Sequence, residues 1–253
     1  MTERSYREAP PAPDLAAHVR CVWVRRVAPS QAPPVRVVPD GCMDLIWRYG
    51  GRSSQLFVAG PDTAAQVSQT AAGTAFVGLR FRPGAAAAIL GVPASELVDG
   101  RPDAGALWGR AAAELARQLE GADPGGAVAI LEDAVRRRLA TAPSPDPIVQ
   151  QVVAALERAP HRRPARIERL ARTVGISERQ LHRRCLAALG YGARTFTGIV
   201  RFQRFLELAD GPGTHSLASL AAESGYADQS HLTREVHRLA GTTPARLLAE
   251  YAD

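Results

Sequence analysis

Residues 170–190, LARTVGISERQLHRRCLAALG, and residues 220–241, LAAESGYADQSHLTREVHRLAG, are two copies of one helical pattern. Each copy opens on Leu-Ala, reaches a glycine five residues later, continues through a polar run and closes on a second glycine. Glycine takes positive φ at little cost, so the first glycine of each copy predicts a tight turn between two short helices. Two short helices joined by such a turn form a helix-turn-helix unit, and the sequence therefore predicts two units in succession.

The second helix of each copy has a clear start and one apolar face. Ser177, with Gln180 three positions later, is a capping box, and Asp228 is the N-cap expected in the second copy. We expect His231 to make a local structural hydrogen bond, and a catalytic base is the alternative role for it. The apolar positions recur at helical spacing: Leu181, Cys185 and Leu189 in the first copy, and Leu232, Val236 and Leu239 in the second.

The outer face of each second helix carries side chains that can hydrogen-bond base edges or phosphates. Arginine can pair bidentately with guanine in the major groove, and glutamine can pair with adenine. Between the copies, residues 190–210 have apolar side chains at helical spacing and predict a helix that holds the units apart. Two such helices reach successive major grooves when they lie about 34 Å apart on one face of the duplex. The outer-face residues are Glu178, Arg179, His182 and Arg183 in the first copy, and Gln229, Ser230, Thr233 and Arg234 in the second.

Net positive charge is concentrated in the same part of the chain. All 31 basic residues are arginine, and 14 of them lie after residue 160 against nine acidic residues. The first 160 residues are almost balanced, with 17 arginines and 16 acidic residues. A basic excess of this kind favours a polyanion as partner, although a solvated basic face is the alternative.

The chain divides at residues 141–147, TAPSPDP, where three alternating prolines predict an extended connector. Upstream, residues 35–49 contain two strand-like runs around Pro39-Asp40-Gly41-Cys42, which predict a β-hairpin. Further strand and then helix patterns predict an α+β domain of antiparallel strands followed by helices. The expected domains are an α+β sensor or dimerisation domain at 1–140, the linker at 141–147, and an all-α domain with two helix-turn-helix units at 148–253.

The N-terminal domain contains candidates for sensing a signal. A thiol beside a turn with acidic neighbours could respond to oxidants or electrophiles, and tryptophans could line an apolar ligand pocket, but ordinary packing explains both. Three scattered cysteines give no disulfide framework and no metal-ligand spacing, so we expect neither metal nor cofactor. The alternative, a metal site joining His18 and Cys21, rests on no spacing signal. The sensor candidates are Cys21, Cys42, Asp40, Asp44, Trp23 and Trp47.

Residues from about 148 to 250 resemble the DNA-binding domain of the AraC/XylS family of bacterial transcription regulators. The resemblance rests on the doubled unit and on Gly225, Gln229-Ser230-His231-Leu232, Arg234, Gly241 and Thr243-Pro244. It implies seven helices and base contacts from Arg179, His182 and Arg183 in the first recognition helix and from Gln229, Ser230 and Thr233 in the second, with Arg234 on phosphate. Cys185 and Val236 stand where the family usually has phenylalanine. Two further stretches, VPDGCMDLIW and GLRFRPGAAAAILGVPASEL, resemble a poorly characterised domain that precedes such modules.

These features together predict a sequence-specific transcription regulator that binds double-stranded DNA and is no enzyme. The chain shows neither a secretory signal nor a membrane span, so the expected location is the cytoplasm. A small-molecule effector and a second copy of the chain, as a homodimer, stay open as further partners. The alternative is a DNA-repair or alkyl-transfer enzyme with Cys42 as nucleophile, but no neighbouring base activates that thiol.

Overall fold

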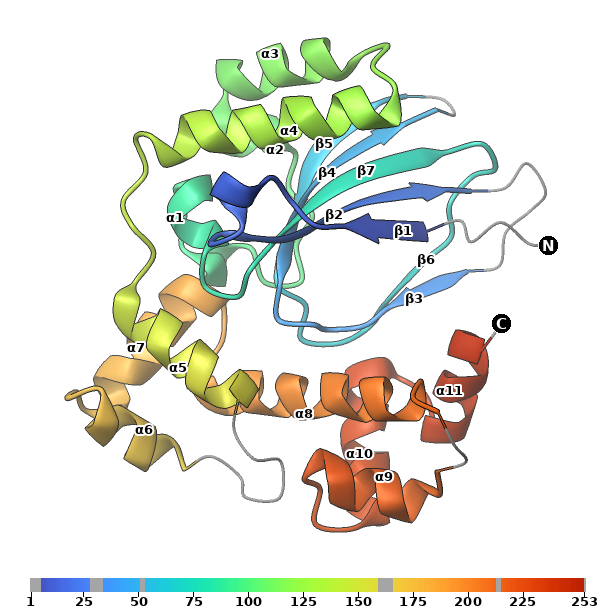
Figure 1. Ribbon diagram of the computed structural model, residues 1–253, viewed down its shortest axis with the longest axis vertical. Helices are drawn as coiled ribbons and strands as arrows, with labels where there is room; N and C mark the ends of the chain where they lie inside the picture. Colours follow the sequence, from blue (N-terminus) through green and yellow to red (C-terminus); the bar gives the residue numbers. More distant parts are fainter. Residues whose placement is uncertain (1–5, 28–33, 51–52, 159–165, 213–214, 253) are drawn as a thin grey trace.

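The structure is a computed structural model that describes residues 6–27, 34–50, 53–158, 166–212 and 215–252. The described residues form two large buried clusters, one around an antiparallel sheet and one among helices. Figure 1 shows the sheet and its helices in the upper half and the other helices below. The predicted fold class, an α+β part with antiparallel strands before helices and then an all-helical part, is confirmed.

The upper half is built on a five-stranded antiparallel sheet of order β1-β2-β7-β4-β5, and a separate ribbon pairs β3 with β6. Side chains alternate between the two faces of a strand, so Met43, Leu45 and Trp47 enter one core while Asp44 and Ile46 face the other side. The strands are β1 (Tyr6–Ala9), β2 (Val19–Arg26), β3 (Val35–Val37), β4 (Met43–Tyr49), β5 (Gln55–Ala59), β6 (Gln66–Ser68) and β7 (Ala75–Phe81).

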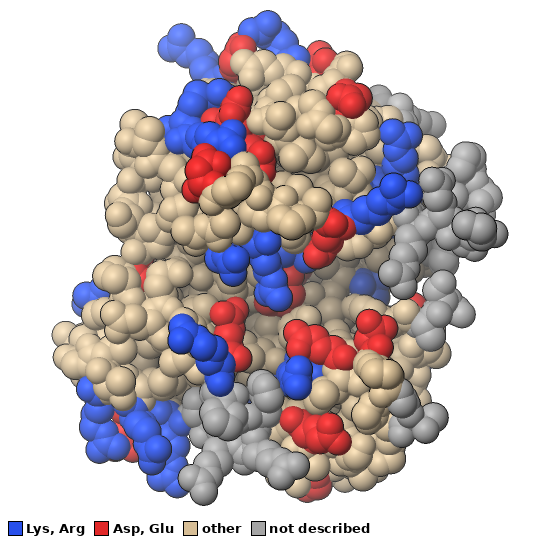
Figure 2. Space-filling view, in the orientation of Figure 1, with Lys and Arg blue, Asp and Glu red and all other residues tan. Residues whose placement is uncertain are grey.

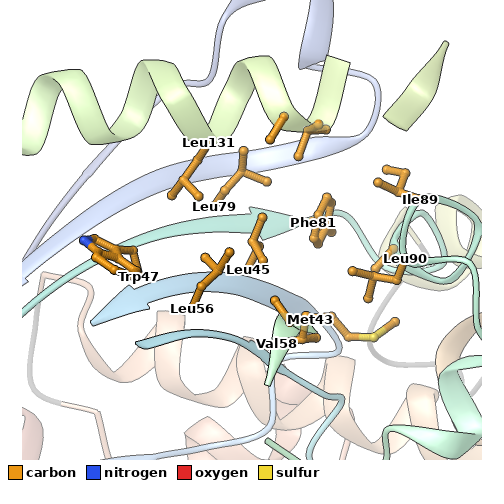
Figure 3. Close-up of a cluster of buried hydrophobic side chains, with 14 of the residues drawn as sticks. Met43, Leu45, Trp47, Leu56, Val58, Leu79, Phe81, Ile89, Leu90 and Leu131 are labelled. Carbon is orange, nitrogen blue, oxygen red and sulfur yellow. The ribbon is translucent and has the colours of Figure 1, made fainter. Parts of the chain in front are cut away.

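Helices cover one face of this sheet and close its core. In Figure 3, Leu131 lies over Leu79, and Ile89 and Leu90 fill the end of the cluster beside Phe81. Each of these side chains is almost fully buried, which contributes roughly 1.5 to 3 kcal/mol apiece. The helical elements are η1 (Pro13–Leu15), α1 (Ala86–Leu90), η2 (Ala94–Glu96), α2 (Ala104–Trp108), α3 (Arg110–Leu119) and α4 (Pro124–Leu139).

The β-hairpin predicted around residues 39–42 is wrong. β3 pairs with β6, whereas β4 pairs with β5 and β7. The segment between β3 and β4 instead lies against a helix of the lower half: Gln203 Nε2 donates to the carbonyl of Pro39 at 2.6 Å. Gly41 has φ +82°, and a Cβ there would lie 2.7 Å from the ring of Phe196. The glycine turn predicted at residue 41 is present, but it brings the segment against α8 and does not join two paired strands.

The lower half contains seven helices in its described residues, as the family resemblance implied. The longest is α8, which was predicted between the two copies and supplies Phe196, Phe202 and Phe205 to the second core. Residues 141–146 of the predicted linker precede α5, which begins at Pro147, and Asp146 caps its start by accepting from the Ile148 N–H. The helices are α5 (Pro147–Arg158), α6 (Ile167–Thr173), α7 (Glu178–Leu189), α8 (Ala193–Ala209), α9 (Leu217–Ser224), α10 (Gln229–Ala240) and α11 (Pro244–Ala252).

Candidate nucleic-acid interface

The first helix-turn-helix unit consists of α6 and α7. Gly175 takes φ +72° in the turn, as expected for a glycine that ends a helix. The predicted capping box is present: Ser177 Oγ accepts from the Gln180 N–H at 3.2 Å, and Gln180 Oε1 accepts from the Ser177 N–H at 2.9 Å. Leu181 and Cys185 are completely buried. The first turn of α7 is therefore fixed by its cap and its outer face is left to solvent.

The outer face of α7 presents the three residues expected to contact bases. Arg179, His182 and Arg183 are all exposed. His182 is the most constrained of them because its ring lies against the backbone of Gly192, where a Cβ would come within 2.6 Å of Nδ1. The backbone at the start of α8 thus limits the positions that the His182 ring can take.

The second unit repeats this geometry with α9 and α10. Gly225 takes φ +84° between the helices, and Asp228 is the N-cap, with Oδ1 accepting from the His231 N–H at 2.7 Å. The imidazole Nδ1 of His231 accepts from the Ala227 N–H at 3.3 Å, so His231 makes the local structural bond predicted for it. Leu232 is fully buried. The polar cluster at the start of α10 is therefore a helix cap with an exposed outer face.

The expected contact residues of α10 differ in exposure. Gln229, Ser230 and Arg234 are exposed. Thr233 is half-buried, and its hydroxyl donates to the carbonyl of Gln229 at 2.9 Å, which leaves the hydroxyl oxygen able to accept a further bond. Both helices, hereafter the recognition helices, thus present polar first turns above an apolar base.

The helix caps give a direct stability prediction. Replacing Ser177 with alanine removes the acceptor for the Gln180 N–H and should lower the free energy of unfolding by about 0.5 to 2 kcal/mol. Ser177→Asp, which restores an acceptor, should recover most of the loss. Urea denaturation measures both variants, and an unchanged midpoint for Ser177→Ala would contradict the assigned role of the cap.

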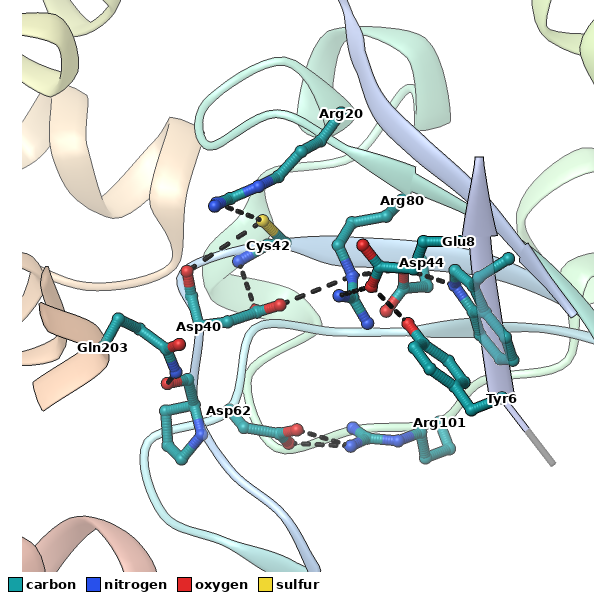
Figure 4. A network of polar contacts seen from close by, with 12 residues as sticks. Tyr6, Glu8, Arg20, Asp40, Cys42, Asp44, Asp62, Arg80, Arg101 and Gln203 are labelled. Atoms are coloured by element: carbon teal, nitrogen blue, oxygen red, sulfur yellow. Dashed lines mark hydrogen bonds and ion pairs between the residues drawn. The ribbon is translucent and has the colours of Figure 1, made fainter. Parts of the chain in front are cut away.

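Several of the sensor candidates meet on the side of the sheet away from α4. Arg80 Nε lies 3.1 Å from Asp44 and 3.4 Å from Asp40, and Trp23 Nε1 donates to Asp44 at 3.1 Å. The Cys42 N–H donates to Asp40 at 2.9 Å. Figure 4 shows Asp40, Cys42, Asp44 and Arg80 close together, with Gln203 of α8 at one end. We call Asp40, Cys42, Asp44, Arg80 and Trp23 the polar cluster.

The other two sensor candidates lie outside this cluster. Cys21 is buried beside Trp23 in a small apolar group, whereas Trp47 points into the main core on the opposite face of the sheet. Arg80, the cation at the centre, was missed because one arginine in the apolar run GLRF looks like a solvent-facing position. Only tertiary structure brings it between Asp40 and Asp44.

Burial dominates the electrostatics of the polar cluster. It raises the pKa of Asp44, against the opposing influence of Arg80. Burial alone would lower the pKa of Arg80, but the carboxylates of Asp44 and Asp40 raise it instead. Burial, reinforced by Asp40, also raises the pKa of Cys42 well above its usual range. The cluster is a partly buried ion network beside a buried thiol that is kept protonated.

The cysteines should therefore react slowly in the folded protein. Burial raises the pKa of Cys21 to about 12 and that of Cys185 to about 11, and Cys42 is shifted in the same direction. Since the thiolate is the reactive form, a disulfide reagent at pH 8 should label none of the three until the chain is unfolded. Rapid labelling of Cys21 or Cys42 in the native protein would favour thiol sensing.

The enzyme alternative finds no support in this geometry. An alkyl-transfer nucleophile needs an accessible thiol of lowered pKa, but Cys42 is buried and its pKa is raised. Among the described residues, no group of three or more His, Cys, Asp or Glu side chains could hold a metal ion. In the same part of the chain, no helix has the length and apolarity to cross a membrane.

Comparison with known proteins assigns families to both halves of the chain. Residues 170–250, which contain both units except the first three residues of α6, match the family described as a helix-turn-helix domain. Residues 7–103 match a family described as a domain of unknown function, DUF6597. No curated protein matches the chain.

Solved structures similar to the chain include two that are described as a transcriptional factor or regulator, and a third protein, ToxT. The DNA-binding domain of AdpA, a global transcriptional factor in complex with a target DNA, is 25% identical, covers 42% of this chain and 93% of its own, and has a TM-score of 0.37. A probable AraC family transcriptional regulator from Rhodopseudomonas palustris is 28% identical, with coverages of 41% and 96% and a TM-score of 0.37. Apo ToxT from Vibrio cholerae is 11% identical, with coverages of 90% and 97% and a TM-score of 0.50, a likeness that shows the fold alone.

The family match, the doubled unit and the exposed recognition helices agree. They define the C-terminal part as a helix-turn-helix DNA-binding domain. Residues 170–250 therefore belong to that helix-turn-helix family, with the doubled unit of the AraC type, and the chain is a DNA-binding transcription regulator.

Proposed function

We propose that the recognition helices α7 and α10 enter successive major grooves of one duplex, and that the N-terminal unit, residues 1–140, holds them at a fixed spacing. The regulator would act in the compartment that holds the chromosome, the cytoplasm, and its DNA step needs neither a cofactor nor a catalytic residue. The proposed base contacts are Arg179, His182, Arg183, Gln229, Ser230 and Thr233, with Arg234 on phosphate.

One observation carries the proposal: a single segment of the N-terminal unit contacts the last turns of both recognition helices. At its start, Pro61 packs on Gly190 at the end of α7, where a Cβ would lie 2.6 Å from Pro61 Cγ. At its other end, the Ala65 N–H donates to the carbonyl of Leu239 in α10 at 2.7 Å. We call these contacts, with those of Gln203 and Phe196 to the segment before β4, the seam.

Arg36 adds a charged contact to the seam. Its guanidinium donates to the carbonyl of Ala240 at 2.7 Å and pairs with Glu250 at 2.8 Å. The last carbonyls of a helix lack partners within the helix and carry partial negative charge, so a cation there is favourable. Both recognition helices therefore end against the N-terminal unit and begin at the side facing away from it.

This arrangement supports a route by which a signal would reach the DNA. Pro39, which accepts from Gln203 of α8, is the residue before Asp40 of the polar cluster. A small-molecule effector that binds at the polar cluster would act if its affinity differed between two conformations of the chain, one with the seam intact and one with the seam loosened. The candidate sensor residues are thus Asp40, Cys42, Asp44 and Trp23, with Cys21 beside them and Trp47 in the core behind.

Selection of bound sequences from random duplex DNA by the full chain tests the function. Each chain should recover two different short motifs whose centres lie about one helical turn, roughly 10 base pairs, apart. A direct or inverted repeat of that pair would indicate that a homodimer binds. Recovery of unenriched DNA would contradict the proposal.

A further inference from the structure

The helix between the two units, α8, has two faces with different surroundings. One face lies against the N-terminal unit through Phe196 and Gln203. The other carries Arg194, Thr197 and Arg201, which helical spacing places along one side of α8. This second face has no role in the function described so far.

A pocket opens along the second face of α8. It has a volume of about 410 Å³ and lies between α8 and the first turns of α6 and α7. Three arginines line it, Arg166, Arg194 and Arg201, together with the glutamates Glu168 and Glu178. In Figure 2, arginines also gather on the neighbouring surface over α6, at the lower left.

The charges around the pocket leave two cations available. Glu168 pairs with Arg172 at 3.3 Å, outside the lining. Arg201 is held over the ring of Tyr226, 5.1 Å from its centroid. Arg166 and Arg194 are exposed, and neither forms an ion pair within the part of the chain that the structure describes. The pocket therefore offers the guanidinium groups of Arg166 and Arg194 to an anion from solvent, with the Glu178 carboxylate beside them.

The position of this face relates it to both recognition helices. At one end of the face, Glu178 is the first residue of α7, next to Arg179. At the other end, the Tyr226 ring under Arg201 meets His231, in the first turn of α10, edge-on at 5.3 Å between centroids. The second face of α8 thus runs from the first turn of one recognition helix to the first turn of the other.

We propose that this face of α8 is a third DNA contact and that its pocket binds a phosphate of the backbone between the two major grooves, through Arg194 and Arg166. The inference rests on the proposed function. If both first turns enter successive grooves about 34 Å apart, the backbone between them must pass along α8, whose 17 residues span about 25 Å. The same pocket would position the duplex without reading its sequence.

The test is the salt dependence of DNA binding by full-length variants. Arg194→Gln should weaken binding to the selected site and to random duplex by the same several-fold factor. It should also reduce the slope of log affinity against log salt by about 0.9, the share of one phosphate. Arg166→Gln should behave alike, and Arg194→Lys, which keeps a point charge, should retain the slope. Arg110→Gln, which removes an equal charge from α3, is the matched control and should change neither quantity.

The outcomes separate this contact from the function on which it rests. If Arg194→Gln bound DNA as tightly as the wild type and with the same salt slope, the phosphate contact would be overturned. The proposed role of the recognition helices would be unaffected. A loss confined to the selected site would also overturn it, because it would make Arg194 a base contact. If the wild-type chain bound no duplex at all, the proposed function would fail, and this contact with it.

Discussion

Replacing Arg183 with alanine should weaken binding to the selected DNA site by about 5- to 150-fold, which corresponds to about 1 to 3 kcal/mol. Arg183 is exposed on the outer face of α7, in its second turn after the cap formed by Ser177. Its guanidinium can donate two parallel hydrogen bonds to guanine, and alanine can donate none. Titration of a labelled duplex at fixed salt measures the loss.

Random duplex separates base reading by Arg183 from a general charge effect. If Arg183 reads a base, Arg183→Ala should lose much less affinity for random duplex than for the selected site. Arg110→Ala, which removes the same charge from α3, should leave both affinities unchanged. Equal losses of Arg183→Ala on both duplexes would make it a phosphate contact and contradict its assigned role.

Replacing Gly190 with alanine should be the most disruptive single methyl addition at the seam. Gly190 has φ +87°, and its new Cβ would lie 2.6 Å from Pro61 Cγ, 3.0 Å from Val98 Cγ2 and 3.2 Å from the Ala94 carbonyl oxygen. Backbone strain costs about 1 kcal/mol or more, and overpacking typically adds about 1 to 3 kcal/mol. Urea denaturation should show a loss of about 2 to 4 kcal/mol.

Gly175→Ala is the matched control because it carries the strain without the crowding. Gly175 has φ +72°, and a Cβ there would meet nothing within 4 Å. Gly175→Ala should lower the free energy of unfolding by only the cost of backbone strain, about 1 kcal/mol. Gly190→Ala should also weaken binding to a two-motif site more than binding to a single motif, because a fixed spacing matters only when both grooves are filled. Equal behaviour of the two variants would contradict the role of the seam.

Local signals in the sequence predicted the DNA-binding part well. The caps at Ser177 and Asp228 bond to N–H groups three residues away, so their spacing is visible in the sequence and both are confirmed. The turns at Gly175 and Gly225 are equally local. Whether Arg179 or Gln229 contacts a base stays a prediction, since exposure alone does not select a partner.

In the N-terminal unit, the decisive contacts join residues far apart in the sequence, and local patterns could not predict them. β3 pairs with β6, some thirty residues away, so a turn between β3 and β4 misled the hairpin prediction. Asp44 and Trp47, both sensor candidates, lie three residues apart on β4. Because side chains alternate along a strand, they face opposite sides of the sheet and cannot form one site. The bond from Arg36 to Ala240 spans 204 residues, and no periodicity or motif could have indicated it.

The spacing between the two selected motifs tests the central claim most directly. The claim is that one rigid chain fills two successive grooves, so inserting five base pairs between the motifs turns the second by about half a helical turn. We predict that affinity for the altered site falls to that for one motif alone, and that ten or eleven inserted base pairs do not restore it, because the seam fixes the distance. Undiminished binding to the altered sites would show that the units move independently and would contradict the account.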